Sequence, residues 1–257
     1  MNIFVFDIET IPDLNSGRRL YQLDGLSDKD VAQAMFHIRR QEDGTEFLRH
    51  HLHQVVAISV VLRSANRFKV WSLGDIDAEE PELIHRFFDG LERFRPTLVS
   101  WNGTGFDLPV LHYRSLLHGV AAPAYWDVGE TDRDFKWNNY INRYHYRHLD
   151  LMDVLASYQG RANARLDEIA TMLGLPGKMG MSGDKVWDAY SEGNLQGIRD
   201  YCETDVLNTY LVYLRFELIR GNLTSDQYEQ ECELVRTSLE EEDKAHFHSF
   251  LEQWYPV

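Results

Sequence analysis

The chain has 257 residues, enough for one large domain or two small ones, and its 44% of hydrophobic residues is ordinary for a globular protein. Its net charge of −15 argues against a protein that coats nucleic acid through overall positive charge. No segment approaches the roughly 18 apolar residues of a membrane span, and the chain begins with a strand pattern, so we expect a cytoplasmic protein without membrane association.

Apolar runs and helix-start signals, taken in chain order, predict strands in the first half of the chain and mostly helices in the second. The expected strands are 2–6, 54–62, 67–73 and 97–101, and the expected helices are 28–40, 78–94, 108–118, 151–158, 166–173, 185–191 and 195–220, with two more in the tail. Three strands, a helix, a strand and then helices indicate an α/β fold with a central mixed sheet covered by helices on both faces.

An irregular segment, residues 119–147, is too long for an ordinary connection and is expected to be functional or an insertion. Residues 133–147 hold four basic residues against one acid, with aromatic residues between them. Because bases stack on aromatic rings and arginines pair with phosphates, Arg143 and Arg147 are candidates for binding a nucleic acid strand. An ordered insertion whose tyrosines pack on the core remains an equal alternative.

Two acids, Asp7 and Glu9, follow the first apolar strand with one residue between them. Positions i and i+2 of a strand point to the same side, so both carboxylates face one space. Burying two such acids without a cation is costly. A site is therefore favoured over the alternative of a solvated strand end.

A third acid, Asp107, ends the sequence Trp-Asn-Gly-Thr-Gly-Phe-Asp that follows the strand 97–101. It directly precedes a helix with Pro109 near its start, which alone favours a helix N-cap. The sharp turn at Asn102 and Gly103 is a usual location for a site and supports the functional alternative.

The helix 195–220 carries Tyr201 and Asp205, which are four residues apart and so share a face. Such a pair is more often on the surface than in a site. Cys202 and Val206 occupy the neighbouring stripe of the helix, which indicates that this region is partly buried.

Taken together, the three motifs supply four carboxylates and a phenol. Converging carboxylates raise one another's pKa, and hard divalent cations resolve that repulsion. Oxygen-rich sites suit Mg²⁺ or Mn²⁺, and a pair of such ions can clamp the attacking and leaving oxygens of a phosphodiester. The set of motifs predicts a metal-dependent nuclease.

The order Asp-x-Glu, Asn-x-x-x-Phe-Asp and Tyr-x-x-x-Asp resembles the DEDD superfamily of 3′-5′ exonucleases, and the tyrosine resembles its DEDDy branch. Together with Leu-Pro-Gly-Lys at 175–178, the motifs are most similar to predicted exonucleases related to the proofreading domain of family B DNA polymerases. The resemblance implies a ribonuclease H-like domain over residues 1–216, with a five-stranded mixed sheet. Residues 217–257 would be an acidic helical extension packed on the same domain.

The resemblance also implies roles for individual residues. Asp7, Glu9, Asp107 and Asp205 match the acids that hold two Mg²⁺ or Mn²⁺ ions, and Tyr201 matches the tyrosine that orients the attacking water. The residues that match positions contacting the terminal nucleotide are Thr10, Ile11, Asn102 and Phe106.

Two further acids and the histidines are weaker candidates. Asp150 and Asp153 are expected to be a strand-end and a helix-start acid beside the site rather than metal ligands. Among the 11 histidines, the groups at 50–53 and 145–148 lack thiols, so polar surface is favoured over a zinc site.

The function expected from the sequence is hydrolysis of single-stranded nucleic acid from its 3′ end, releasing nucleoside 5′-monophosphates. One alternative is a catalytically inactive nucleic-acid-binding module, which the retention of all four acids argues against. Another is a hydrolase of short oligonucleotides, which would use the same site with a smaller channel.

Overall fold

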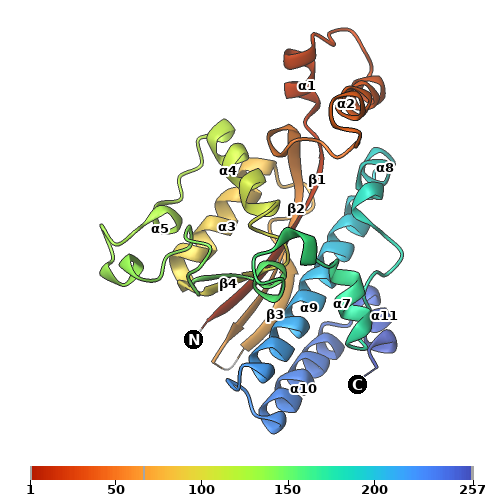
Figure 1. The fold of residues 1–257 in the computed structure, drawn as a ribbon. Coiled ribbons are helices and arrows are strands. Elements are labelled where there is room, and N and C mark those ends of the chain that lie inside the picture. The colour runs from red at the N-terminus through yellow and green to blue at the C-terminus, as the bar shows by residue number, and fades with distance from the viewer. Residues whose placement is uncertain (1, 66, 256–257) are drawn as a thin grey trace.

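A five-stranded sheet with the order β3-β2-β1-β4-β5 forms the centre of the protein in a computed structural model that describes residues 2–65 and 67–255 (Figure 1). The strands are β1 (Ile3–Pro12), β2 (His53–Ser64), β3 (Arg67–Ser72), β4 (Thr97–Ser100) and β5 (His148–Asp150). β1, β2 and β3 pair antiparallel, whereas β4 pairs parallel with both β1 and β5. The expected mixed sheet is confirmed.

Helices cover both faces of this sheet, as expected for the α/β fold (Figure 1). On one face lie α7 (Leu166–Met172), α9 (Leu195–Ile219), α10 (Ser225–Glu242) and α11 (Ala245–Gln253); on the other lie α3 (Glu80–Phe94), α4 (Asp107–His118) and α5 (Pro123–Trp126). Shorter or peripheral helices are α1 (Leu14–Tyr21), α2 (Asp28–Asp43), α6 (Leu151–Leu155) and α8 (Val186–Ser191).

The alternation of side chains along β1 assigns its residues to the two layers. Ile3 and Val5 belong to the core under α9, whereas Phe4, Phe6 and Ile8 belong to the core under α3 and α4. Because strand side chains alternate between faces, the odd-numbered positions that follow Val5 also point towards the α9 layer. This parity places the β1 acids opposite the helix that carries the third motif.

Three differences from the expected elements have local causes. β1 continues to Pro12, because it pairs with β2 beyond the acids, with a bulge between Glu9 and Thr10. Helix α1 was missed; its polar sequence is capped by Asp13, and Gly17 allows close packing on Met35. β5 was expected only indirectly, through the strand-end role of Asp150, because its three residues carry too little periodicity and pairing with β4 forms it.

The acidic segment that follows α9 packs on α9 through an apolar face. Its buried residues are Tyr228, Cys232, Val235, Leu239, Phe247 and Phe250, and they share one core with β1, β4 and α9. α9 itself runs to Ile219, so the expected boundary at residue 217 falls in its last turn. In the described part of the chain, no helix has the length and apolar character needed to cross a membrane.

The segment 119–147 is ordered around two short helical turns, α5 and a 3-10 turn at Arg133–Lys136. Tyr125, Phe135 and Tyr140 are buried under α3, and the Tyr140 hydroxyl donates to the Pro96 carbonyl over 2.8 Å. Trp137 is 77% exposed. Part of this segment therefore packs on the core, and part of its aromatic surface faces solvent.

Candidate active site

Asp7 and Glu9 lie inside β1 and point towards α9. Asp7 is half-buried and Glu9 is buried, and in the antiparallel register they pair with Ser59 and Ala57 of β2. The bulge directly after Glu9 shifts the register of the β1–β2 pairing, which then continues to Pro12. The i, i+2 relation expected from the sequence is therefore present within the strand itself.

The turn after β4 brings Asp107 to the same edge of the sheet. Helix α4 begins at Asp107, Phe106 occupies the position before it, and no side chain caps this helix. The Asp107 carboxylate instead accepts a hydrogen bond from the backbone nitrogen of Ile8, 3.1 Å away. Asp107 is therefore joined to β1 between Asp7 and Glu9, and the cap predicted as its alternative role is not formed.

A crowded backbone holds this turn. Asn102 has φ of 63°, and a Cβ on Gly103 would lie 2.3 Å from the Ser100 hydroxyl oxygen, so only glycine fits there. Asp150, at the end of β5, accepts from the backbone nitrogens of Asn102 and Thr104 at 2.9 and 2.8 Å. Its carboxylate therefore supports the turn, in line with the expectation of a strand-end acid beside the site.

Helix α9 presents Tyr201 and Asp205 to the acids of β1. Burial, followed by the charge of Asp205, raises the pKa of the Tyr201 phenol, so the two groups lie close together. Tyr201 is buried and Asp205 is half-buried. The neighbouring Cys202 is fully buried, with its sulfur 3.5 Å from the Asp7 carbonyl oxygen. The third motif therefore lies against the first, although they are about 200 residues apart in the sequence.

The four acids perturb one another strongly. Burial, followed by the charges of the other acids, raises the pKa of Asp7 and of Glu9 well above the ordinary range. Burial raises the pKa of Asp107 to about 7, and burial also raises the pKa of Asp205 to about 7 despite hydrogen bonding by Tyr201. In the described residues only Lys178 acts on this group as a cation, lowering the pKa of Asp205. If the four acids were ionised together, their charge would be buried and one lysine would not balance it, which is why their pKa values are raised.

The carboxylates of this group fit a hard divalent cation, whereas the neighbouring Cys202 thiol does not. Ligand atoms of Asp7, Glu9 and Cys202 lie within 4.8 Å of one another. Carboxylate oxygens are the ligands that Mg²⁺ and Mn²⁺ prefer, and a cation would relieve the repulsion that raises these pKa values. A buried, uncompensated carboxylate cluster is what such an ion would stabilise.

A cleft of about 400 Å³ opens above these acids. Its lining residues include Asp7, Asn102, Phe106, Asp107, Tyr201 and Asp205, and on the opposite wall Asn163, Arg165, Asp167 and Lys178. The sequence interpretation gave no role to this opposite wall. Lys178 follows Gly177, which has φ of 63°. The Gly177 backbone nitrogen donates to the side chain of the buried Asn208 of α9, and that side chain donates back to the Gly177 carbonyl. In the sequence, the only indication of this wall was a lysine that directly follows a proline and a glycine.

Of the residues expected to touch the terminal nucleotide, Asn102 and Phe106 line the cleft, whereas Thr10 and Ile11 do not. Thr10 is hydrogen-bonded to His53 over 2.8 Å, and the Ile11 side chain is buried under α8, where it lines a separate pocket. The Phe106 ring packs against Phe47 and His53, with centroids 5.3 and 5.1 Å away. Phe47 is 55% exposed, so the aromatic surface of Phe106 extends outwards from the cleft.

The two arginines expected to bind a strand are engaged elsewhere. Arg143 pairs with Asp153 over 2.8 Å and is partly exposed. Arg147 donates to the carbonyls of Asn138 and Arg95, and its guanidinium lies 4.7 Å from the centre of the Phe135 ring. Neither lines the cleft. The structure does not bring them to the acids, and Arg147 instead stabilises segment 119–147.

The histidines do not form a metal site in the described part of the chain, where the Asp7, Glu9 and Cys202 group contains none. His53 and His148 are buried, and burial lowers the pKa of each to about 4. The His148 ring is bonded to the Ser100 hydroxyl over 2.9 Å. These two are neutral core histidines, whereas the sequence suggested polar surface.

The order and direction of the five strands and the helices on both faces define a ribonuclease H-like fold. A model of the family described as predicted 3′-5′ exonucleases related to the exonuclease domain of PolB matches residues 45–254. The chain belongs to this family. The match extends through the acidic segment beyond residue 216 and begins after Asp7 and Glu9.

A solved structure supports the same fold. The family B DNA polymerase from the hyperthermophilic archaeon Pyrobaculum calidifontis is similar over 85% of this chain, with a TM-score of 0.51 and 19% sequence identity. The matched region is 24% of the polymerase chain. The likeness therefore concerns the fold of one part of that enzyme.

Proposed function

We propose that this protein is a metal-dependent 3′-5′ exonuclease of the DEDDy type. It would hydrolyse phosphodiester bonds from the 3′ end of a single-stranded nucleic acid and release nucleoside 5′-monophosphates. The observation that carries the proposal is the convergence of four acids from β1, α4 and α9, of which Asp7, Glu9 and Asp107 have no cationic partner among the residues that the structure describes. Membership in a family of predicted exonucleases supports it.

In this proposal Asp7, Glu9, Asp107 and Asp205 hold two Mg²⁺ or Mn²⁺ ions. When bound, such ions lower the pKa of a coordinated water and neutralise charge on the phosphate. Tyr201 orients the attacking water through its hydroxyl, which also contacts Asp205.

The walls of the cleft hold the strand in the same proposal. Asn102 and Phe106, with the backbone at Thr10 and Ile11, bind the terminal nucleotide. Stacking of a base on an aromatic ring contributes about 1–3 kcal/mol, which suits the exposed surface of Phe106 and Phe47. Arg143 stays a candidate for a more distant phosphate, whereas the contacts of Arg147 favour a structural role.

The deciding experiment incubates purified protein with 5′-labelled single-stranded DNA, single-stranded RNA and a dinucleotide, in Mn²⁺, in Mg²⁺ and in excess chelator. A metal-dependent ladder that shortens from the 3′ end supports the proposal. Cleavage of the dinucleotide alone would favour the oligonucleotide hydrolase. Strand binding without any product would favour the inactive binding module.

Replacement of Tyr201 by Phe is expected to lower the single-turnover rate by about 10²-fold while changing strand affinity little. The hydroxyl acts near the transition state, and the buried ring keeps its packing. Rapid-quench kinetics and fluorescence anisotropy measure the two quantities. A wild-type rate in the Tyr201→Phe protein would remove the hydroxyl from the mechanism.

Replacement of Lys178 by Met is expected to lower kcat/KM by about tenfold and to make it less dependent on salt. The ammonium lines the cleft opposite the acids, 4.0 Å from Asp167, where it can pair with a phosphate. The matched control is Lys185, which ends the 3-10 turn Gly183–Lys185 and does not line the cleft. Equal effects of Lys178→Met and Lys185→Met would indicate general electrostatics in place of a specific contact.

A further inference from the structure

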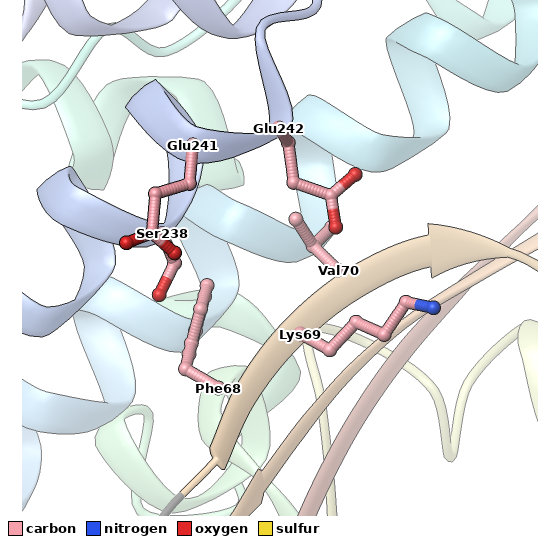
Figure 2. Close-up of a pocket in the computed structure, with 6 residues that line it drawn as sticks. All are labelled: Phe68, Lys69, Val70, Ser238, Glu241 and Glu242. Carbon is pink, nitrogen blue, oxygen red and sulfur yellow. The ribbon is translucent and has the colours of Figure 1, made fainter.

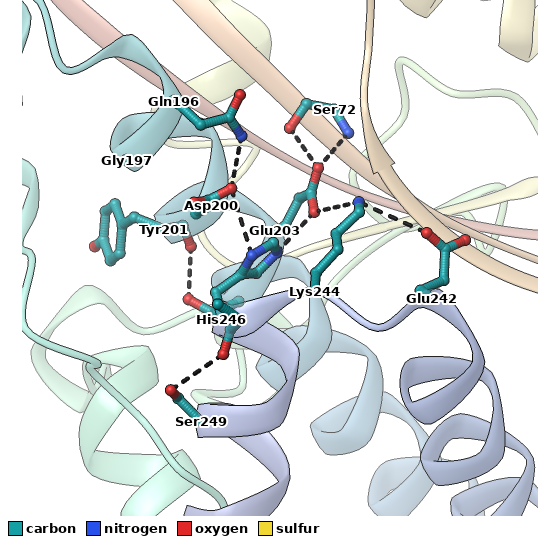
Figure 3. Close-up of polar contacts among 12 residues, drawn as sticks. Ser72, Gln196, Gly197, Asp200, Tyr201, Glu203, Glu242, Lys244, His246 and Ser249 are labelled. Carbon is teal, nitrogen blue, oxygen red and sulfur yellow. Dashed lines mark hydrogen bonds and ion pairs between the residues drawn. The ribbon is translucent and has the colours of Figure 1, made fainter.

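The third motif contains an acid that the proposed reaction does not use. Glu203 lies between Tyr201 and Asp205 on α9, and its side chain is 6% exposed. It accepts hydrogen bonds from the Ser72 backbone and hydroxyl at the end of β3, both over 2.9 Å. Lys244, directly before α11, and His246, in the first turn of α11, approach its other oxygen at 3.1 and 2.9 Å (Figure 3).

The polar chain continues beneath the acids of β1. The Ser72 hydroxyl lies 2.9 Å from the Ser59 hydroxyl, and Ser59 is the residue of β2 paired with Asp7. Contacts therefore run from the C-terminal segment through Glu203 to the strand position that carries the first acid. They join the two elements, α9 and β1, whose relative placement sets the distance between the proposed metal ligands.

The C-terminal segment makes polar contacts at two separate places, with Glu203 of α9 and with Arg63 of β2. Between them is a groove of about 470 Å³ between β3 and the end of α10, lined by Phe68, Lys69, Val70, Ser238, Glu241 and Glu242 (Figure 2). At the far end Glu231 of α10 pairs with Arg63 over 2.6 Å. Because Arg63 pairs with Ile3 in the β1–β2 register, this contact is four residues away from Asp7 along β1.

The charge on Glu203 makes its partners important. Its side chain is 6% exposed, and its two oxygens are contacted by Ser72 on one side and by the Lys244 ammonium and the His246 ring on the other. A buried carboxylate that loses its cationic partners is strongly unfavourable. Without them, α9 would move to hydrate Glu203, and Tyr201 and Asp205 would move with it.

We propose that Lys244 and His246 are positioning residues for the reaction centre, which act through Glu203 to hold Tyr201 and Asp205 opposite Asp7. The inference rests on the proposed function. It also makes the acidic segment a working part of the exonuclease domain, because residues 40 positions beyond the last metal-binding acid would set the geometry of the site.

The test uses the full-length protein with His246→Gln and Lys244→Met, singly and together. For the double variant we expect the single-turnover rate and the Mn²⁺ affinity measured by calorimetry without substrate each to fall about tenfold, because a small misplacement of catalytic groups is costly. KM for the strand should change by less than about twofold, since the nucleotide-binding wall is separate. Lys244→Arg, which keeps the charge, should retain the wild-type values.

The matched control is Glu231→Gln, which breaks the other contact of the same segment. It should lower the melting temperature as much as the double variant does, with unchanged rate and Mn²⁺ affinity. Equal rates and Mn²⁺ affinities in the double variant and this control would overturn the positioning role. If the wild-type protein degrades no strand, the proposed function fails, and the Mn²⁺ affinities still decide whether Lys244 and His246 position the acids.

Discussion

The Asp205→Asn protein is expected to lose about 10²–10³-fold or more in turnover and yet to melt at a higher temperature than the wild type in metal-free buffer at pH 8. Removal of one preorganised electrostatic contact has a cost of this size in other enzymes. The gain in stability follows from the structure, because the Asp205 carboxylate lies beside other buried acids. Water does not screen the repulsion between them, and the substitution removes it. Asp7→Asn should behave in the same way.

Glu217→Gln provides the matched control on the same helix. Glu217 is also a shielded acid, with its side chain 14% exposed, but it pairs with Arg220 over 2.9 Å. Neutralising it removes an attraction, so a small loss of stability and full turnover are expected. Rates come from single-turnover assays and melting from calorimetry in chelator. A fall in melting temperature for Asp205→Asn as large as that of a core mutation would show that the acids are structural.

Metal-free protein should become less stable as the pH rises above about 6.5, by on the order of 1–3 kcal/mol by pH 8.5. Asp107 and Asp205 have pKa values raised to about 7, so the folded state holds protons that the unfolded state has released. The stability that such an acid contributes is fully present below its pKa in the unfolded state, near 4. It is lost as the pH rises to and past its pKa in the folded state. The loss contributed by these two acids therefore begins above about pH 4 and is complete shortly above pH 7, so its last part falls above pH 6.5.

The buried histidines act in a different window. The pKa values of His53 and His148 are lowered to about 4, so their unfolded forms bind more protons below pH 6.5 and their contribution rises with pH only up to that point. Urea unfolding in chelator from pH 5 to 8.5 should thus show a maximum near pH 6.5. Adding Mn²⁺ at pH 8.5 should restore stability by binding to the folded state. A flat profile above pH 6.5, unaffected by Mn²⁺, would contradict the charged cluster.

Local rules were sufficient for much of the fold. The alternation of a strand placed Asp7 and Glu9 on one side, and the turn of a helix placed Tyr201 and Asp205 on one face, because both relations depend only on backbone geometry. Most helix and strand boundaries followed from apolar periodicity and Gly and Pro signals in the same way. The short β5 and the polar α1 escaped, since each depends on partners distant in the sequence.

Only the tertiary structure decided which local faces meet. The binding of Asp107 to the backbone of Ile8 and the use of Asp150 to support the Asn102 turn join segments about 50 to 100 residues apart. Arg147 is a case in which the local sequence was misleading. Its charge suggested a contact with a nucleic acid strand, but its guanidinium donates to the carbonyls of Asn138 and Arg95. Which partner a charged side chain meets depends on chain segments that periodicity does not connect, and burial then determines whether that charge is neutralised, paired or left for a metal.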